Sequence, residues 1–254
     1  MKKILQTTLF IILKVLFPKL TLGGSILVYH SVGDNDAFFT VASNKFKSQM
    51  EQIKKKGLRV VLLSELIDAY YANKDLVGCV SITFDDGYID NLTTVLPILR
   101  SYGYKASVFV IPGRMGEANV TSDGFTLPLF SLSDFHRYGA YDTFELLPHT
   151  MNHPDLSVLS PNEQETEIQA AYEALSDTHK VLAYPWGQYS QETLALLKKN
   201  KWKAACTVVP GLVKKNTNPY LFPRNPVDSL TLPNTLGVYL SDGIEWYSQI
   251  RSFI

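Results

Sequence analysis

The stretch CVSITFDDGY, residues 79–88, carries the pattern that decides the fold of this 254-residue chain. Residues 79–84 are small, β-branched or aromatic, as in a buried strand of a parallel sheet. Asp85 and Asp86 end this run, although neighbouring carboxylates repel one another and are costly to desolvate. Gly87 then provides a turn. Taken alone, the stretch fits either a solvated Asp-Asp-Gly turn or a strand that carries two functional carboxylates to its end.

Strand-like runs alternate with segments of helical period on both sides of this stretch. Strands are expected over 25–30, 58–63, 79–84, 105–111, 143–149, 180–185 and 203–211. Helices are expected over 43–57, 64–71, 91–103, 131–139, 160–175, 190–200 and 243–254. Residues 112–130, which carry Gly, Pro and polar side chains, are expected to form a long surface loop, and residues 209–235 are interrupted repeatedly by proline. Pro97 is expected to bend its helix. The alternation predicts βαβ units, and about seven of them favour a parallel α/β barrel over an open sheet.

The composition favours a folded domain without net charge. Hydrophobic residues make up 46% of the chain, and lysine plus arginine balance aspartate plus glutamate at 24 each. Because no net field attracts a polyanion, nucleic acid is not expected as a partner, and a glycan or a small molecule fits better. Cys79 and Cys206 lie in apolar, strand-like runs, so we expect two buried thiols rather than a disulfide. No repeat or linker divides residues 25–254, and nothing in the sequence assigns an oligomeric state.

Residues 1–24 form a separate apolar or amphipathic segment. Two lysines followed by an apolar run resemble the start of a signal peptide, but Lys14 interrupts the run and no A-x-A-like site follows. Leu9, Ile12 and Leu16 would share one face of a helix. We expect an amphipathic helix that packs on the domain or lies on a membrane surface, which favours a cytoplasmic or membrane-associated protein. An uncleaved anchor or a weak signal, and hence export, is the alternative.

Reactive side chains of a parallel α/β barrel gather at the carboxyl ends of its strands. Four expected strands end in polar or aromatic residues, namely His30; Asp85 and Asp86; His149 and His153; and Tyr184-Pro185-Trp186-Gly187. Two histidines four residues apart can bind one metal through their ring nitrogens, although two surface histidines would give the same pattern. With one carboxylate added, the set matches catalytic zinc and non-haem iron sites. Neighbouring residues of a strand point to opposite sides, so the second aspartate would be free to act as a base.

Two of these stretches together resemble polysaccharide deacetylases of the NodB type, carbohydrate esterase family 4. The first motif of that family reads T-F-D-D-G and the second H-[ST]-x-x-H, and both occur here, at residues 83–87 and 149–153. The resemblance extends from about residue 25 to about residue 227. It implies a distorted (β/α)7 barrel, and we expect residues 25–254 to form a single polysaccharide deacetylase domain.

By position, the resemblance makes Asp86, His149 and His153 the ligands of a divalent metal. Zinc is expected first, with cobalt, nickel or iron as alternatives. Asp85 becomes the general base. The reaction implied is removal of an acetyl group from an N-acetylated sugar, which leaves an amine and acetate. A backbone N–H near Asp86 or Tyr88 is expected to stabilise the oxyanion.

The third motif of the family departs from its common form. That form reads R-x-P-x-G, whereas residues 183–187 read AYPWG, so that Ala183 occupies the arginine position. The stretch resembles an aromatic variant found in the family. Tyr184, Pro185 and Trp186 are therefore predicted to line a sugar pocket, since aromatic faces suit the apolar face of a pyranose. Core packing of the two aromatic rings is the alternative.

Two roles of the family must be filled from other positions. Arg224, in LFPRNPV, is the candidate to orient the base, with a surface or structural arginine as the alternative. The family commonly takes its general acid from a histidine near the C-terminus, but no histidine follows His179 here. One branch, which includes poly-N-acetylglucosamine deacetylases, carries the acid on an N-terminal strand that ends in Y-H. LVYHSVGD resembles that strand, so His30 is predicted to be the acid; a structural histidine is the alternative.

The function expected first is metal-dependent N-deacetylation of an N-acetylhexosamine-containing glycan or glycan precursor. Hydrolysis of an O-acetyl ester or of a non-sugar C–N bond is the second possibility, because the same centre could serve both. A weakly active glycan-binding module that keeps the fold is the third. A pseudo-enzyme is expected to lose a ligand or the base, whereas all four of these positions are filled here.

Overall fold

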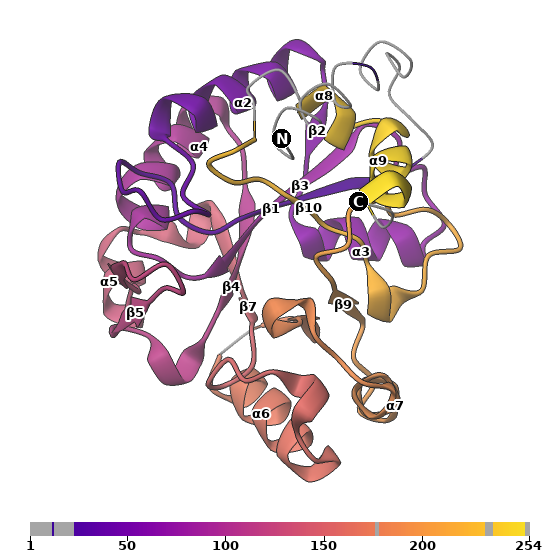
Figure 1. The fold of residues 1–254 in the computed structure, drawn as a ribbon. Coiled ribbons are helices and arrows are strands. Elements are labelled where there is room, and N and C mark those ends of the chain that lie inside the picture. Colours follow the sequence, from indigo (N-terminus) through magenta and orange to yellow (C-terminus); the bar gives the residue numbers. More distant parts are fainter. Residues whose placement is uncertain (1–11, 13–22, 176–177, 232–235, 252–254) are drawn as a thin grey trace.

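The computed structural model describes residue 12 and residues 23–175, 178–231 and 236–251. A parallel sheet forms its centre, with the strand order β10-β1-β3-β4-β7 and with β2 paired to β3 (Figure 1). The strands of this sheet are β1 (Ser25–Tyr29), β2 (Arg59–Val60), β3 (Cys79–Asp86), β4 (Ala106–Val110), β7 (Phe144–Pro148) and β10 (Asn225–Pro226). Two further strands, β8 (Val181–Ala183) and β9 (Ala204–Cys206), form a separate parallel pair.

Helices connect and cover the strands. They are α2 (Ser43–Lys55), α3 (Leu63–Tyr71), α4 (Leu96–Tyr102), α5 (Leu132–Arg137), α6 (Pro161–Glu173), α7 (Gln191–Lys199), α8 (Leu236–Tyr239) and α9 (Gly243–Arg251). Helices α2 and α4 pack together on one side of the sheet, and α6 and α7 pack together beside β7, β8 and β9 (Figure 1). The predicted α/β class with a parallel sheet is confirmed.

The barrel is not closed by hydrogen bonds among the described strands, because β8–β9 is separate from the sheet that ends in β7. Each strand of the pair is only three residues long. Strand β8 nevertheless packs against β7, and Thr178 Oγ1 donates a hydrogen bond to Leu146 O (2.8 Å) just ahead of β8. The seven-stranded barrel therefore takes the form of an open sheet with a short pair beside it.

Strand β3 separates an apolar face from a polar one. Ile82 and Phe84 are fully buried in the cluster that includes the inner sides of α2 and α4. Thr83 and Asp85 alternate with these residues along the strand, so their side chains point to its other side, where they are equally buried. This alternation explains why a carboxylate can lie inside the molecule: Asp85 takes the inward position of a strand whose other face forms the core.

The predicted loop over 112–130 and the proline-rich segment over 209–235 both contain strands. Residues 112–130 hold an antiparallel hairpin of β5 (Ala118–Val120) and β6 (Thr126–Pro128), with Gly124 at φ +87° in its turn. The proline-rich segment holds β10, which pairs with β1. The prediction of a loop over 112–130 was therefore wrong, because short edge strands tolerate proline, and the same tolerance allows Pro226 to end β10.

The predicted helix over 91–103 begins as a π-helix, Asn91–Val95, and continues as α4. Pro97 is the second residue of α4, where the π-helix, whose last residue Val95 is also helical, continues directly into it. The proline therefore lies inside one helical segment, at the change of helical type, and the bend expected there stays a prediction. Gly103, at φ 67°, ends α4 in the left-handed conformation that glycine adopts readily.

The predicted amphipathic segment at residues 1–24, and its contact with a membrane, fall almost entirely outside the described residues. Within the described parts of the chain, no helix has the length and apolar character needed to span a bilayer.

Candidate active site

Strand register brings the predicted metal ligands to one level. Asp86 at the end of β3 pairs with Val110 of β4, and Val110 pairs with Pro148 of β7. The next residue, His149, donates its backbone N–H to Val110 O (2.8 Å). The carboxyl ends of three neighbouring strands therefore place Asp86 and the histidine loop side by side.

The same register places the predicted acid and base together. Tyr29 of β1 pairs with Phe84 of β3, so that His30 and Asp85 each come one residue later at the same edge of the sheet. His30 is partly buried, and its ring centroid lies 5.2 Å from that of Phe39. It is close enough to Asp85 for an electrostatic interaction.

Asp86, His149 and His153 offer one ligand atom each, and these atoms lie within 4.8 Å of one another. Asp86 Oδ1 is 3.8 Å from His149 Nε2 and 3.6 Å from His153 Nε2. This oxygen is buried and has no hydrogen-bond partner among the described residues. A buried carboxylate oxygen without a donor, facing two imidazole nitrogens, is the arrangement that a divalent cation would complete. The residues present therefore fit a metal.

The two imidazoles are prepared to act as neutral ligands. His149 Nδ1 lies 2.8 Å from Ala183 O. A carbonyl can only accept, so Nδ1 carries the hydrogen and Nε2 presents its lone pair to the cluster. Burial lowers the pKa of His149. Burial, together with the neighbouring His149, lowers the pKa of His153 to about 4.

The histidine loop has an unusual backbone. Thr150 and His153 adopt φ values of 61° and 63°, and Asp86, opposite them, adopts 70°. For residues other than glycine, each such conformation costs roughly 1–3 kcal/mol and persists only where surrounding contacts enforce it. The loop provides one such contact itself, since His153 N donates to Thr150 Oγ1 (3.1 Å).

Two outside elements support the loop between its histidines. Glu167 of α6 accepts hydrogen bonds from Asn152 N (2.9 Å) and Asn152 Nδ2 (2.7 Å) through its two carboxylate oxygens. On the other side, Gly113 N donates to Met151 O (2.9 Å). A Cβ added at Gly113 would lie 2.6 Å from that oxygen, so only glycine fits there. The spacing of the two ligands thus depends on residues outside the motif.

Asp85 is held by Arg224 in a bidentate ion pair. Arg224 Nη1 and Nη2 lie 2.6 and 2.7 Å from the two carboxylate oxygens, and the arginine side chain is fully buried. Arg224 Nε also donates to Thr207 O (3.0 Å). Burial raises the pKa of the Asp85 carboxyl, but the Arg224 guanidinium together with the nearby imidazoles of His149 and His30 has the larger effect, and the pKa falls to about 2. Asp85 is therefore an ionised carboxylate in a fixed orientation, 3.9 Å from His149 Nε2.

The aromatic residues divide between surface and core. Trp186 is 62% exposed, adopts φ 58°, and places its ring centroid 5.0 Å from that of His153. Tyr184, in contrast, is 1% exposed and donates its hydroxyl to Tyr220 O (2.8 Å). Pro185 is also buried. The prediction that all three line a sugar pocket is thus corrected, because in this structure Tyr184 and Pro185 belong to the core behind Trp186.

Tyr88 lies beside the ligand cluster without being exposed. It is 1% exposed, and its hydroxyl accepts a hydrogen bond from Asn119 Nδ2 (2.7 Å). Burial, followed by the negative charge of Asp86, raises the pKa of Tyr88, so the phenol stays neutral. Its ring stacks on Phe39 at 5.4 Å, which joins the turn after β3 to the segment after β1.

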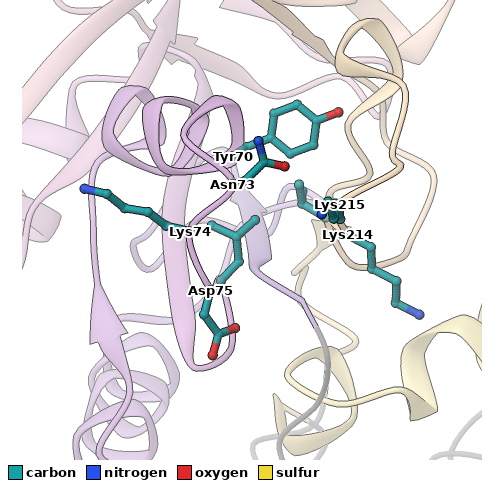
Figure 2. A pocket seen from close by; sticks show the side chains of 8 residues that line it. Tyr70, Asn73, Lys74, Asp75, Lys214 and Lys215 are labelled. Carbon is teal, nitrogen blue, oxygen red and sulfur yellow. The ribbon is translucent and has the colours of Figure 1, made fainter.

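A separate cavity of about 280 Å³ lies between the end of α3 and residues 213–215 (Figure 2). Its wall includes Leu76, just before β3, and Val213, which bridges to the residue before β1. The cavity is thus at the amino ends of the strands, away from the predicted site. Figure 2 shows the side chains of Lys74 and Lys214 extending to opposite sides rather than toward one ligand position.

Three residues that support the site were not predicted. Thr150 could have been found, because the second position of H-[ST]-x-x-H requires a hydroxyl. Glu167 and Gly113 carry no local signal, since each acts through a contact formed only in the folded chain.

Comparison with known proteins identifies the family of this chain. The family model described as polysaccharide deacetylase matches residues 72–205. The protein YxkH of Bacillus subtilis (strain 168), which carries a provisional name as a polysaccharide deacetylase, is 26% identical over 220 residues, covering 85% of this chain and 75% of YxkH. The poly-beta-1,6-N-acetyl-D-glucosamine N-deacetylase of Staphylococcus aureus (strain MSSA476) is 26% identical over 203 residues, covering 73% of this chain and 67% of that enzyme.

A solved structure shows the same fold. The Streptococcus pyogenes deacetylase PplD, in complex with acetate, is 26% identical, superposes with a TM-score of 0.72, and covers 86% of this chain and 97% of its own. The likeness extends over nearly the whole of that protein. It confirms the α/β fold of NodB type that the motifs predicted.

Proposed function

The chain belongs to the polysaccharide deacetylase family, and from that premise we propose that it removes N-acetyl groups from an N-acetylhexosamine-containing glycan. The family is one of hydrolases acting on non-peptide C–N bonds. One observation carries the proposal: three ligand atoms within 4.8 Å of one another lie next to a carboxylate that a buried arginine holds ionised. This is the pairing that metal-assisted amide hydrolysis requires.

Asp86, His149 and His153 would hold the divalent metal, with zinc expected first and cobalt, nickel or iron as alternatives. When bound, such an ion supplies a Lewis acid that polarises the acyl oxygen and lowers the pKa of water. The burial of Asp86 and His149 excludes bulk solvent from this side of the site, so that charges act there more strongly than in water. Hydrogen bonding of His149 Nδ1 to Ala183 O keeps the ring in its ligand orientation.

Asp85 accepts the proton of the attacking water in the proposed mechanism. Arg224 donates hydrogen bonds to both carboxylate oxygens, which fixes the orientation of Asp85 and keeps it ionised. The ionised carboxylate can then accept a proton. His30 donates a proton to the leaving nitrogen, so that the C–N bond breaks to give a neutral amine and acetic acid, which loses its remaining proton to solvent and is released as acetate. The backbone N–H of Tyr88 would stabilise negative charge that develops on the acyl oxygen.

Trp186 is proposed to bind the sugar ring next to the reacting acetamide. An exposed indole held in a left-handed conformation beside His153 offers an apolar face to a pyranose. Among N-acetylhexosamine polymers, a β-1,6-linked poly-N-acetylglucosamine is the first to test, because the Staphylococcus aureus relative is named for that substrate.

Acetate release from a panel of glycans tests the proposal. We expect release from poly-β-1,6-N-acetylglucosamine or chito-oligosaccharides, loss of activity after exhaustive chelation, and recovery on adding one equivalent of Zn²⁺ or Co²⁺. Acetylated xylan serves as the ester control, and release from it alone would favour an O-acetyl esterase. Activity that survives complete metal removal, checked by elemental analysis, would contradict the proposed mechanism.

His30→Ala tests whether His30 is the general acid. We expect kcat for an N-acetylated oligosaccharide to fall by roughly 10²–10³-fold, because the amine cannot leave without a proton. Hydrolysis of an aryl acetate should change by less than about threefold, because a phenolate leaves without protonation. His136→Ala is the matched control, since that histidine is exposed and contacts Tyr141 rather than the site. Equal losses on both substrates would show that His30 is not the acid.

A further inference from the structure

Two neighbouring side chains hold the backbone of the segment that carries His30. Asp90 and Asn91 follow the turn after β3, and Asn91 opens the π-helix. Neither residue belongs to a motif discussed above. Their partners are three consecutive residues of the segment after β1, which is otherwise loop. The same short stretch of chain therefore carries Asp85 and Asp86 and also contacts the residues around His30.

Each hydrogen bond falls on a different residue of that segment. Asn91 Nδ2 donates to His30 O (2.9 Å). The two oxygens of Asp90 accept from Ser31 Oγ (2.5 Å) and from Val32 N (3.1 Å). The carbonyl of His30, the side chain of Ser31 and the N–H of Val32 are thus bound at once, which leaves little freedom in the backbone that directs the imidazole.

The arrangement is costly, which argues for a role beyond simple packing. Asn91 is fully buried, and its Oδ1 has no hydrogen-bond partner within the described parts of the chain. An unpaired buried acceptor costs roughly 1–3 kcal/mol. Burial also raises the pKa of Asp90 to about 6, although its hydrogen bonds act in the opposite direction. The π-helix that Asn91 opens is itself a rare element, frequent at functional sites.

We propose that Asp90 and Asn91 are positioning residues for the general acid, fixing the backbone at His30–Val32 so that the imidazole stays aimed at the leaving nitrogen. The inference rests on the proposed function, in which His30 donates that proton. It adds a physical link between the two halves of the site. The metal ligand and base at the end of β3, and the acid at the end of β1, are then held in register by hydrogen bonds as well as by strand pairing.

Asn91→Ala tests the proposal with the two substrates used for His30. We expect kcat for the N-acetylated oligosaccharide to fall by roughly 10–100-fold with KM little changed, since small displacements of a catalytic group have effects of that size. Aryl acetate hydrolysis should stay within about threefold of wild type. In the His30→Ala background, Asn91→Ala should cause no further loss of amide turnover. Asn91 acts through His30, so its effect disappears once the imidazole has been removed.

Asp90→Ala is a second variant that leaves the buried Asn91 side chain in place. It is expected to give the same selective loss on the amide substrate. Thr93→Ala is the matched control, because Thr93 lies exposed on the same π-helix and should leave both rates unchanged. Thermal unfolding of all variants shows whether each is folded at the assay temperature.

The outcomes separate this inference from the proposed function. Full amide turnover in folded Asn91→Ala and Asp90→Ala, beside a selective loss in His30→Ala, would overturn the inference alone. Equal loss on both substrates, or additive losses in the double variant, would also overturn it, since either result indicates a general structural role. Amide turnover that survives in His30→Ala would overturn the proposed acid and this inference together.

Discussion

Replacement of Asp85 by asparagine is expected to lower deacetylase kcat by roughly 10²–10⁴-fold while the protein still binds one metal ion. Asparagine keeps the size of the side chain but cannot accept the proton of water. In the structure, Asp85 touches Arg224 through both oxygens and lies 3.9 Å from His149 Nε2, so it borders the ligand cluster without being one of its three members.

Asp86→Ala is the matched comparison, one residue along the same strand. Its Oδ1 faces both histidines, so its removal should abolish metal binding and turnover together. Metal content by elemental analysis and kcat on an N-acetylated oligosaccharide distinguish the two variants. If Asp85→Asn loses its metal, or if Asp86→Ala keeps it, the proposed roles of Asp85 as the base and Asp86 as a metal ligand are wrong.

Arg224→Met is expected to lower the free energy of unfolding by about 3–5 kcal/mol, because it leaves the Asp85 carboxylate buried without its partner. Both side chains are at most 3% exposed, so water cannot replace the guanidinium. Urea denaturation measures the change. Turnover should fall as well, since Arg224 keeps Asp85 ionised and fixes its orientation.

Arg100→Met is the control for this prediction. Arg100 lies 2.7 Å from Asp142 on the surface, with 40% and 65% of the two side chains exposed, and solvent screens such a pair. The variant Asp85→Leu/Arg224→Met should be inactive but more stable than Arg224→Met, because it removes both buried charges. A cost for Arg224→Met no larger than for Arg100→Met would contradict a structural role for the buried pair.

The sequence predicted most of this site because its chemistry lies in short motifs. Asp86, His149 and His153 come together as expected, since parallel strands bring their carboxyl ends to one edge. The sequence predicts Arg224 less directly, as a replacement for the arginine that is missing from the third motif. The structure places it on Asp85, 139 residues earlier in the chain.

The remainder depends on contacts that no local pattern encodes. Tyr184 and Trp186 are two residues apart and equally aromatic, yet one is buried and the other exposed, because Trp186 adopts a positive φ that turns it out of the core. In the sequence, Asn91 is an ordinary residue near the start of a helix. Only the folded structure shows that its side-chain amide donates a hydrogen bond to His30 O. No strand pairing joins β7 to β8, because β8 and β9 are short. The periodicity of a sequence does not predict the length of a strand to one residue.

The pairing of β1 with β10 has a consequence for how the protein folds. β1 takes β3 on one side and β10 on the other, and Ser25 Oγ donates to Tyr239 O across 214 residues. Contacts of such sequence separation form slowly, because a long loop must close before they contribute. During synthesis from the N-terminus, Asp85 would remain without its cation until Arg224 has emerged. Activity should therefore appear only in the last kinetic phase of refolding, after most of the helical signal has returned.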